Sequence, residues 1–509
     1  MAALLPNRHG GGWAMKYTIS FDPWAAHAFF APAHCDSPEP IPPYSHLLTT
    51  VPGRSGTVRD ELIKLIDSAS QRVFLCSFLI GGQAVRDALR RAVHRLHGHV
   101  YVITALDDRT LERSLQQEMD EIDRDALRRE RKSFEAITRF GVYVRGASDC
   151  HAKFCVVDDQ AALVGSANFD PNGLDLAEPG ARACGEIALP LAGAERVAPL
   201  AALFRHLWRS GCQREAPPHP SDYRLSGVVP VKAPAPTLPR VAGGVVWTGF
   251  GSKEILAGIF KTIAQAKETL VLGSYSFTAV RENLRPLLDE IASAQKRGVQ
   301  IELLVRDRSR DLPEIAALID IGVEVRANRE NHAKYAIADN CFGLIFSANF
   351  DGVHGLTSGV ETGVWLTTQE AREVAAWHAQ SWREAPFQVA RWQTPADFKQ
   401  AISSVRHEVP PFLGGQISIV GGDEPLRRCA TILAGPCLFV YEGDGTSAGE
   451  MHLVGVDDMV ELKRNGSTVC VFGVERSARN FLTLPKLIAS RKNHRTNRWL
   501  PLGLQVNLA

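Results

Sequence analysis

The sequence lacks any long hydrophobic run. After Met1, its N-terminus carries four apolar residues in a row before Pro6, which is shorter than the hydrophobic region of a secretory signal peptide. No segment approaches the roughly 20 uninterrupted apolar residues that a membrane-spanning helix needs. These absences exclude an integral membrane protein, and we expect a soluble, cytoplasmic chain. Residues 1–14 have a loop-like composition, so Met15 is an alternative start.

Cysteine patterns that hold metals or disulfide frameworks are also missing. Ten cysteines are scattered from Cys35 to Cys470 without a CxxC pair, which favours reduced, mostly buried thiols. Cys150 and Cys155 flank His151, but a zinc site there would lack its remaining ligands. We therefore expect neither a metal nor a cofactor.

Charge of one sign is not in excess. The chain has 57 basic and 56 acidic residues, so no overall field marks a polyanion as partner, and any such signal must be local. With 509 residues, of which 45% are hydrophobic, the chain is long enough for two large cores and a smaller third unit.

The sequence does contain one internal repeat. A helix with apolar residues at helical spacing, capped by Thr57 and Asp60, precedes a strand-like run at 73–78, and a helix after Ser252 precedes one at 269–275. Each copy continues with a helix, a buried strand and a short Gly-Val-x-Val-Arg strand, at 85–96, 100–106 and 141–145 and at 281–297, 301–305 and 322–326. This alternation predicts an α/β fold with two pseudo-symmetric lobes.

Composition suggests where these lobes end. Seven prolines between 213 and 245 favour an extended linker. We expect an N-terminal extension, a first lobe, this linker, a second lobe and an accessory β-rich region, at 1–49, 50–212, 213–245, 246–395 and 396–509.

The first copy is the longer one. Ser77 and Ser274 are 197 residues apart, whereas His151 and His332 are 181 apart, so the first copy has 16 extra residues. They fall in a charged amphipathic helix, in which Leu111 to Leu127 provide an apolar stripe. A solvated rim helix and a cap that shapes the substrate site both fit this pattern.

Two matching segments carry the chemistry. Each contains His-x-Lys-x4-Asp followed by Ser-x-Asn, and the residues are His151, Lys153, Asp158, Ser166 and Asn168 in the first copy and His332, Lys334, Asp339, Ser347 and Asn349 in the second. In a strand, His and Lys at i and i+2 share one face. The Asp residues fall where a hairpin would turn, so a structural role suits them at least as well as a catalytic one.

These residue types suit cleavage of a phosphodiester. One neutral imidazole can attack phosphorus while the other protonates the departing oxygen. The two lysines, with the amides of Asn168 and Asn349, would hold the nonbridging oxygens, and Ser166 and Ser347 are further substrate-binding candidates. Nothing in this scheme requires a metal ion.

Both segments resemble the HKD motif of the phospholipase D superfamily, and the repeated order of helices and strands is similar to its two-lobed fold. The resemblance implies mixed β-sheets sandwiched by helices in each lobe. It also implies that His151 is the nucleophile, forming a phosphohistidine, and that His332 is the general acid.

Two further expectations follow from the resemblance. The family places an acidic residue after each motif to orient the imidazoles; Glu186 and Glu361 fit that place, with pairing that crosses between the halves. Phe346 precedes Ser347 where the family prefers glycine, and we expect it to narrow one side of the pocket.

The substrate is open between several classes. Residues 476–509 contain seven basic residues and no acidic one; four of them, beside Trp499, suit a nucleic-acid backbone, although a solvated or acid-packed basic face fits equally. These four are Arg491, Lys492, Arg495 and Arg498. We predict a metal-independent nuclease for DNA or RNA. The alternatives are a peripheral phospholipase or phosphatidyl transferase, whose N-terminal WAAHAFFAP would touch a bilayer, and an inactive nucleic-acid-binding scaffold. The active site needs no dimer, because one chain holds both motifs.

Overall fold

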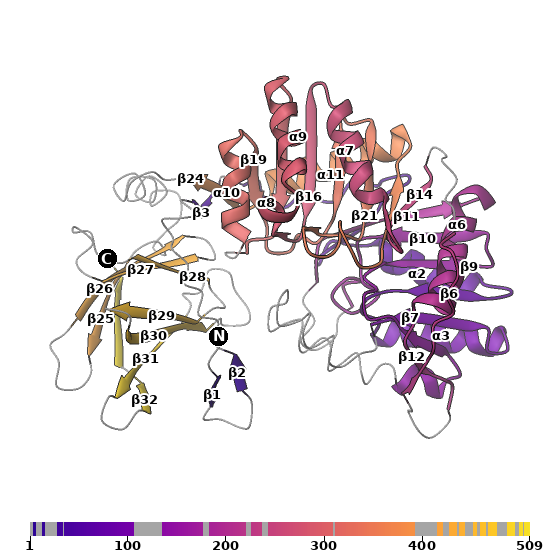
Figure 1. Ribbon diagram of the computed structural model, residues 1–509, viewed down its shortest axis with the longest axis horizontal. Helices are drawn as coiled ribbons and strands as arrows, with labels where there is room; N and C mark the ends of the chain where they lie inside the picture. Colours follow the sequence, from indigo (N-terminus) through magenta and orange to yellow (C-terminus); the bar gives the residue numbers. More distant parts are fainter. Residues whose placement is uncertain are drawn as a thin grey trace. The chain divides into compact units, whose positions relative to one another are not determined.

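The chain forms two compact units (Figure 1). One comprises Asp36–Arg306 and Asp320–Glu384 and contains both motifs; the other comprises Met1–Cys35, Asp307–Ile319 and Ala385–Ala509. The computed structural model describes residues 4–6, 13–15, 28–33, 35–105, 135–176, 183–219, 225–236, 243–308 and 311–391 and strands between 415 and 508. The amphipathic helix expected around 111–127 lies outside these residues.

A ten-stranded mixed sheet forms the first half of the motif-bearing unit. Its strands β6, β7 and β8 are parallel to one another, and the remaining neighbours are antiparallel. In spatial order they are β13 (Ser226–Gly227), β12 (Arg214–Ala216), β8 (Tyr143–Gly146), β7 (Val100–Thr104), β6 (Val73–Cys76), β9 (Phe154–Val157), β10 (Ala161–Gly165), β11 (Glu186–Ala192), β4 (Leu48–Val51) and β5 (Ser55–Gly56).

The second half repeats this order. Within the same unit the strands run β15 (Ser252–Lys253), β14 (Val245–Gly249), β23 (Glu361–Trp365), β21 (Phe342–Phe346), β20 (Tyr335–Ala338), β16 (Thr269–Ser274), β18 (Gln300–Val305) and β19 (Glu324–Ala327). They correspond one by one to the strands from β5 to β8. A short parallel pair, β17 (Phe277–Thr278) and β22 (Phe350–Asp351), is added. The predicted two-lobed α/β repeat is therefore confirmed.

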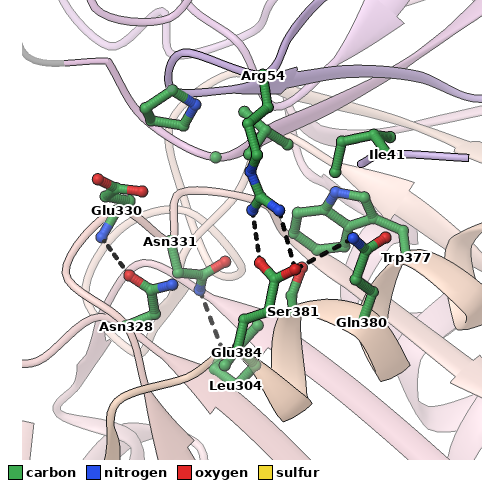
Figure 2. Close-up of a pocket in the computed structure, with 13 residues that line it drawn as sticks. Ile41, Arg54, Leu304, Asn328, Glu330, Asn331, Trp377, Gln380, Ser381 and Glu384 are labelled. Atoms are coloured by element: carbon green, nitrogen blue, oxygen red, sulfur yellow. Dashed lines mark hydrogen bonds and ion pairs between the residues drawn. The ribbon is translucent and has the colours of Figure 1, made fainter. Parts of the chain in front are cut away.

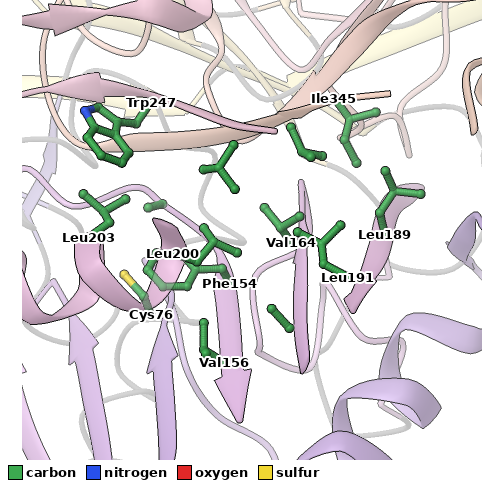
Figure 3. Packing of buried hydrophobic residues seen from close by; sticks show 14 of the residues in the cluster. Cys76, Phe154, Val156, Val164, Leu189, Leu191, Leu200, Leu203, Trp247 and Ile345 are labelled. Atoms are coloured by element: carbon green, nitrogen blue, oxygen red, sulfur yellow. The ribbon is translucent and has the colours of Figure 1, made fainter. Parts of the chain in front are cut away.

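Helices cover both faces of each sheet. They are α2 (Thr57–Ser68), α3 (Gln83–Arg95) and α6 (Ala194–His206), which ends in a π-helical turn (Leu207–Gly211), and α7 (Glu254–Gln265), α8 (Val280–Asn283), α9 (Arg285–Lys296) and α11 (Thr368–Arg383). The α2 and α3 helices bury their apolar stripes against one face of the first sheet. On the other face a shared core joins the two halves, where Trp247 and Ile345 lie across from Phe154, Val164 and Leu189 (Figure 3).

Two local predictions were wrong. Thr57 does not cap α2, because its hydroxyl accepts from the Thr49 N–H at 2.7 Å and donates to the Thr49 carbonyl at 3.1 Å. The helix expected over 281–297 is interrupted at Leu284, and Pro286 lies in the first turn of α9. Proline has no N–H and clashes with the carbonyl four residues earlier, so it begins a helix rather than continuing one.

The first residues of the proline-rich segment form a strand of the first sheet. Within it, β12 pairs with β8, and Ala216 is fully buried. Residues 228–236 have no regular secondary structure. The segment thus contributes an edge of the first lobe before it continues toward the second.

The other unit is rich in strands. It contains β1 (Leu4–Pro6), β2 (Trp13–Met15), the antiparallel pair β3 (Ala28–Pro32) and β24 (Phe387–Arg391), and α10 (Leu312–Asp320) as far as Ile319. Its C-terminal part has two antiparallel sheets, one of β28 (Met451–Gly455), β27 (Cys437–Glu442), β26 (Arg427–Ala434), β25 (Gly415–Val420) and β33 (Gly503–Leu508), and one of β29 (Met459–Arg464), β30 (Ser467–Glu475), β31 (Lys486–Asn493) and β32 (Arg498–Pro501). The β-rich C-terminal region is confirmed. Among the described residues, no helix is long and apolar enough to cross a membrane.

Candidate active site

Each His-x-Lys segment lies just before an inner strand of its sheet. His151 and Lys153 precede β9, and His332 and Lys334 precede β20. We expected these residues inside the strand, but the backbone there bonds to the opposite half of the unit. His151 N–H donates to the Val360 carbonyl at 2.9 Å, and His332 N–H donates to the Gly185 carbonyl at 3.0 Å.

The aspartates of the motifs hold hairpin turns. Asp158 and Asp339 have φ values of 53° and 50°, as the tight turns between antiparallel strands require. Asp158 accepts the N–H groups of residues 70, 71 and 72, and Asp339 those of residues 267, 268 and 269. Burial alone would raise the pKa of each carboxyl, but these donors outweigh it and lower the pKa. Their positions support the structural role that the sequence suggested.

The two histidines pair with glutamates from the opposite half. His151 Nδ1 lies 2.8 Å from Glu361 Oε1, and His332 Nδ1 lies 2.6 Å from Glu186 Oε1. Glu361 follows Val360 and Glu186 follows Gly185, so the same backbone contacts that hold the motifs also position the carboxylates. A carboxylate on Nδ1 favours the tautomer with the proton there, and Nε2 then carries the lone pair. The pairing crosses between the halves, as the resemblance implied.

The motif serines differ from our expectation. Ser166 and Ser347 are fully buried; Ser166 Oγ donates to Glu186 Oε2 at 2.5 Å, and Ser347 Oγ donates to Glu361 Oε2. Each hydroxyl also accepts a backbone N–H from the strand that carries its glutamate. The serines thus orient the two carboxylates and are not placed to bind a substrate.

Both lysines lie inside the site with no solvent exposure. Lys153 Nζ donates to the carbonyl of His151 at 2.6 Å, and Lys334 Nζ donates to that of His332 at 2.7 Å. Burial lowers the pKa of Lys153 and lowers that of Lys334 to about 7, although the nearby glutamates oppose the change. An arriving phosphate would restore the charge of these ammonium groups, because an anion favours their protonated form.

The side chain of each motif asparagine has an unsatisfied amide oxygen. Asn168 and Asn349 are 9% and 8% exposed, and the Oδ1 atom of each is buried without a hydrogen-bond partner among the described residues. Buried amides normally find partners. These two matched Oδ1 atoms are therefore acceptors available to a hydrogen-bond donor.

The two histidine–glutamate pairs differ electrostatically. Burial lowers the pKa of His151, and Glu361 opposes this; burial would raise the pKa of Glu361, but His151 and Lys153 keep it below its ordinary value. In the second pair, burial and then Lys334 hold the pKa of His332 well below its ordinary value, and burial raises that of Glu186 to about 7. Glu361 is thus the firmly ionised carboxylate.

Two residues near His332 were missed by sequence reasoning. The rings of Tyr275 and His332 have centroids 4.9 Å apart, and the Arg306 guanidinium carbon lies 5.0 Å from the Tyr275 centroid. In the first half, Phe78 has the place of Tyr275, 5.2 Å from His151. Alignment of the two repeats at Ser77 and Ser274 could have revealed the Phe/Tyr difference.

Phe346 lies in the core of the second half, where we expected a pocket wall. It is fully buried, with its ring centroid 6.0 Å from that of Phe350. Gly363 faces it on β23, whereas Ala188 faces Gly165 in the first half. A Cβ on Gly363 would lie 2.9 Å from that of Phe346, and one on Gly165 would lie 2.6 Å from that of Ala188. The glycine has therefore changed strands between the repeats.

A pocket lined by both polar and apolar residues adjoins the second half of the site (Figure 2). Gly185 and Asn331 line it, and they directly precede Glu186 and His332. Arg54 donates from both terminal nitrogens to the carboxylate of Glu384 within this pocket, as Figure 2 shows. The pocket therefore already contains an ion pair.

The basic C-terminal residues belong to the other unit. Arg491 and Lys492 lie in β31 and Arg498 lies in the neighbouring β32, where Asn493 pairs with Arg498. Arg495 lies outside the described residues. Their part in substrate binding stays a prediction.

Comparison with known proteins defines the class. A family model described as "Cardiolipin synthase, PLD-like domain" matches residues 62–208 and 259–382, more than half of the chain and both motifs. The chain belongs to the phospholipase D-like family, whose members act on phosphodiester bonds.

Three solved structures are among those that match the chain. Phosphatidylserine synthase of Haemophilus influenzae Rd KW20 is 16% identical over 71% of this chain and 91% of its own, with a TM-score of 0.47. Polyphosphate kinase of Porphyromonas gingivalis is 14% identical over 70% and 52%, with a TM-score of 0.42. Nuc of Salmonella typhimurium, a phospholipase D family member, is 21% identical over 30% and 99%, with a TM-score of 0.25. No curated protein matched the chain.

Proposed function

We propose that the chain is a phosphodiesterase that forms a phosphohistidine on His151 and uses His332 as the general acid. The crossed carboxylate pairs carry this proposal: each Nδ1 is occupied by a glutamate, so Nε2 is the nitrogen left for the reaction. Glu361, the firmly ionised carboxylate, serves His151. An ionised acceptor on Nδ1 raises the nucleophilicity of the opposite nitrogen, as the triad of serine hydrolases illustrates.

The reaction takes place in two displacements. Nε2 of His151 attacks phosphorus, the bond to the leaving oxygen breaks, and that oxygen takes a proton from His332. Water then gives a proton to His332 and attacks phosphorus, so the P–N bond breaks and both histidines return to their first state. Lys153 and Lys334 neutralise the nonbridging oxygens, and the Nδ2 N–H groups of Asn168 and Asn349 donate hydrogen bonds to them.

Nucleic acid is the substrate we favour, and the enzyme would act in the cytoplasm without a metal ion. The surroundings of His332 include the additional cation Arg306, and β31 and β32 carry further basic residues. Contacts to successive phosphates by lysine and arginine supply most of the affinity for a strand. A phospholipid is the second candidate, favoured by the description of the matching family model.

A substrate panel separates these possibilities. Purified protein is incubated with labelled single- and double-stranded DNA, RNA, and phosphatidylcholine and phosphatidylglycerol vesicles, in excess EDTA, with His151→Ala as the inactive control. We expect cleavage of nucleic acid that persists in EDTA. Lipid turnover without strand cleavage would mean that the substrate is a phospholipid and not a nucleic acid. Loss of all turnover on chelation would contradict the metal-free mechanism.

A further inference from the structure

The surroundings of the two catalytic histidines are asymmetric. Ser77 and Ser274 make the same contacts: their hydroxyls donate to the carbonyls of Leu79 and Ser276, each at 2.7 Å. The residues that follow these serines are therefore equivalent, and they are Phe78 and Tyr275. One histidine thus has a phenyl ring beside it and the other a phenol.

The strand beside each serine ends differently. The parallel registers pair Cys76 with Ile103 in the first half and Ser274 with Val305 in the second. Ser77 follows Cys76, so continuing the first register by one residue places Thr104 opposite Ser77. Thr104 is therefore equivalent to Val305, and Ala105 is equivalent to Arg306. Ala105 is buried next to the end of β7, whereas Arg306 lies over the face of Tyr275 and is 9% exposed. A guanidinium therefore exists only on the His332 side of this pair of positions.

The positive charge of Arg306 influences the imidazole of His332. It contributes to the lowered pKa of His332, after burial and the two lysines, and it opposes the raised pKa of Glu330, which lines the pocket of Figure 2. Arg306 thus acts electrostatically on both the general acid and a residue that lines that pocket. Guanidinium groups bind phosphate oxygens through two parallel N–H donors, and stacking on an aromatic ring fixes their orientation.

We propose that Arg306, held against Tyr275, binds a second phosphate of the substrate, the one next to the scissile diester on the leaving-group side. This inference rests on the proposed nuclease function and on His332 as the general acid. It assigns the two walls of the site different partners, because in the part of the chain that the structure describes the position equivalent to Arg306 on the Phe78 side is Ala105. The enzyme would then prefer diesters flanked by a phosphate on one particular side.

Three small substrates test this preference. They are the deoxythymidine dinucleotide with its single diester, the same dinucleotide with a 5′-phosphate, and the same with a 3′-phosphate. The position of the phosphate in the products identifies the leaving-group side. We expect kcat/KM for the probe with the extra phosphate on that side to exceed that of the bare dinucleotide about ten- to hundredfold, the usual range for a charge-assisted contact.

Arg306→Ala should bring this ratio to within about twofold of one, and Arg306→Lys should retain only part of it, because lysine lacks the planar fork. Arg285→Ala is the matched control, because the Arg285 side chain is 70% exposed and pairs with Asp289 at the surface. An unchanged ratio in both Arg306 variants, with strand cleavage intact, overturns the inference alone. If the unmodified protein cleaves none of the three probes nor longer strands, the nuclease function itself fails. Thermal unfolding of each variant confirms that it is folded, and Arg306→Lys suffices if the alanine variant is not.

Discussion

The two halves of the active site share one plan and differ in charge. In both, a histidine bonds through Nδ1 to a buried glutamate of the other half. The carboxyl that serves His151 has a lowered pKa, whereas the one that serves His332 titrates at about 7. Sequence repetition therefore does not produce two equal histidines. The difference teaches that the surroundings of each motif, more than the motif itself, set the charge state of its histidine–glutamate pair.

The largest expected effect comes from removing either histidine. His151→Ala should lower kcat on the order of 10⁴-fold or more, because it removes the nucleophile. His332→Ala should leave the attack on an activated p-nitrophenyl diester intact, since that leaving group needs no proton, so a phosphohistidine accumulates. Rapid acid quench and mass spectrometry measure the adduct. If the His151 variant instead forms the adduct on His332, then His332 is the nucleophile and His151 is the general acid.

Isosteric changes of the glutamates sharpen the comparison. Glu361→Gln removes an ionised carboxylate, and we expect kcat to fall about 10²- to 10⁴-fold at pH 7. Glu186→Gln should cost only about tenfold at that pH, because a group with a pKa of about 7 is already half protonated. Steady-state kinetics compares the two variants. Equal losses would mean that the two pairs are electrostatically equivalent.

The pH dependence follows from the same groups. The pKa values of His151 and His332 are both lowered, so His151 stays neutral into acid while His332 keeps its proton only in acid. We expect kcat/KM to be maximal below pH ~6.5. Lys334, Lys153, Arg306 and His151 lower the pKa of His332, whereas Glu186 is its hydrogen-bond partner. Arg306→Ala removes one positive charge and should move the alkaline limb upward; a downward shift would contradict this assignment.

Stability offers a smaller test of the Glu186 side. The pKa of Glu186 is raised above the value of about 4.5 in an unfolded chain, so the folded protein binds the additional proton. Its contribution is fully present below pH ~4.5 and is lost as the pH rises through about 7. Urea unfolding between pH 4.5 and 8 measures the free energy of unfolding at each pH. In the Glu186→Gln variant this free energy should no longer show the decrease, on the order of 1 to 3 kcal/mol, that Glu186 causes over that range. Glu361→Gln is the control, and it should not flatten the curve in this range.

The motif aspartates should separate stability from activity. Asp158→Ala and Asp339→Ala each remove an acceptor of three backbone N–H groups. We expect each to lower the free energy of unfolding by about 1 to 3 kcal/mol, with kcat of the folded protein within about twofold. A large loss of kcat without destabilisation would make the aspartates catalytic.

Repetition made much of the fold predictable. Apolar periodicity located α2, α3, α7 and the inner strands, because burial in a layered sheet dictates that pattern. The break between α8 and α9 was missed, although Pro286 signalled it. The cap at Thr57 was wrong because Thr49, on a neighbouring strand, competes for its hydroxyl.

The site was predictable as a set of residues, not as a set of contacts. Matched spacing found both histidines, lysines and asparagines. The serines were assigned to substrate because the sequence cannot show that a distant glutamate accepts their protons. Arg306 follows a strand rather than a motif, and its proximity to His332 arises through Tyr275. Contacts between segments far apart in the chain are decided by the packing of the sheets.

Because each histidine pairs with a glutamate of the other half, turnover requires that both halves are assembled. A chain cut within residues 217–239 would give two fragments, each with an entire His-x-Lys motif but each lacking the carboxylate that orients its own histidine. Neither fragment alone would hold a correctly oriented imidazole, and mixing them would restore both at once. The rate of turnover would then be proportional to the concentration of molecules in which the two halves have associated. The chain could therefore serve as a split-protein reporter that is read out by its own enzymatic activity.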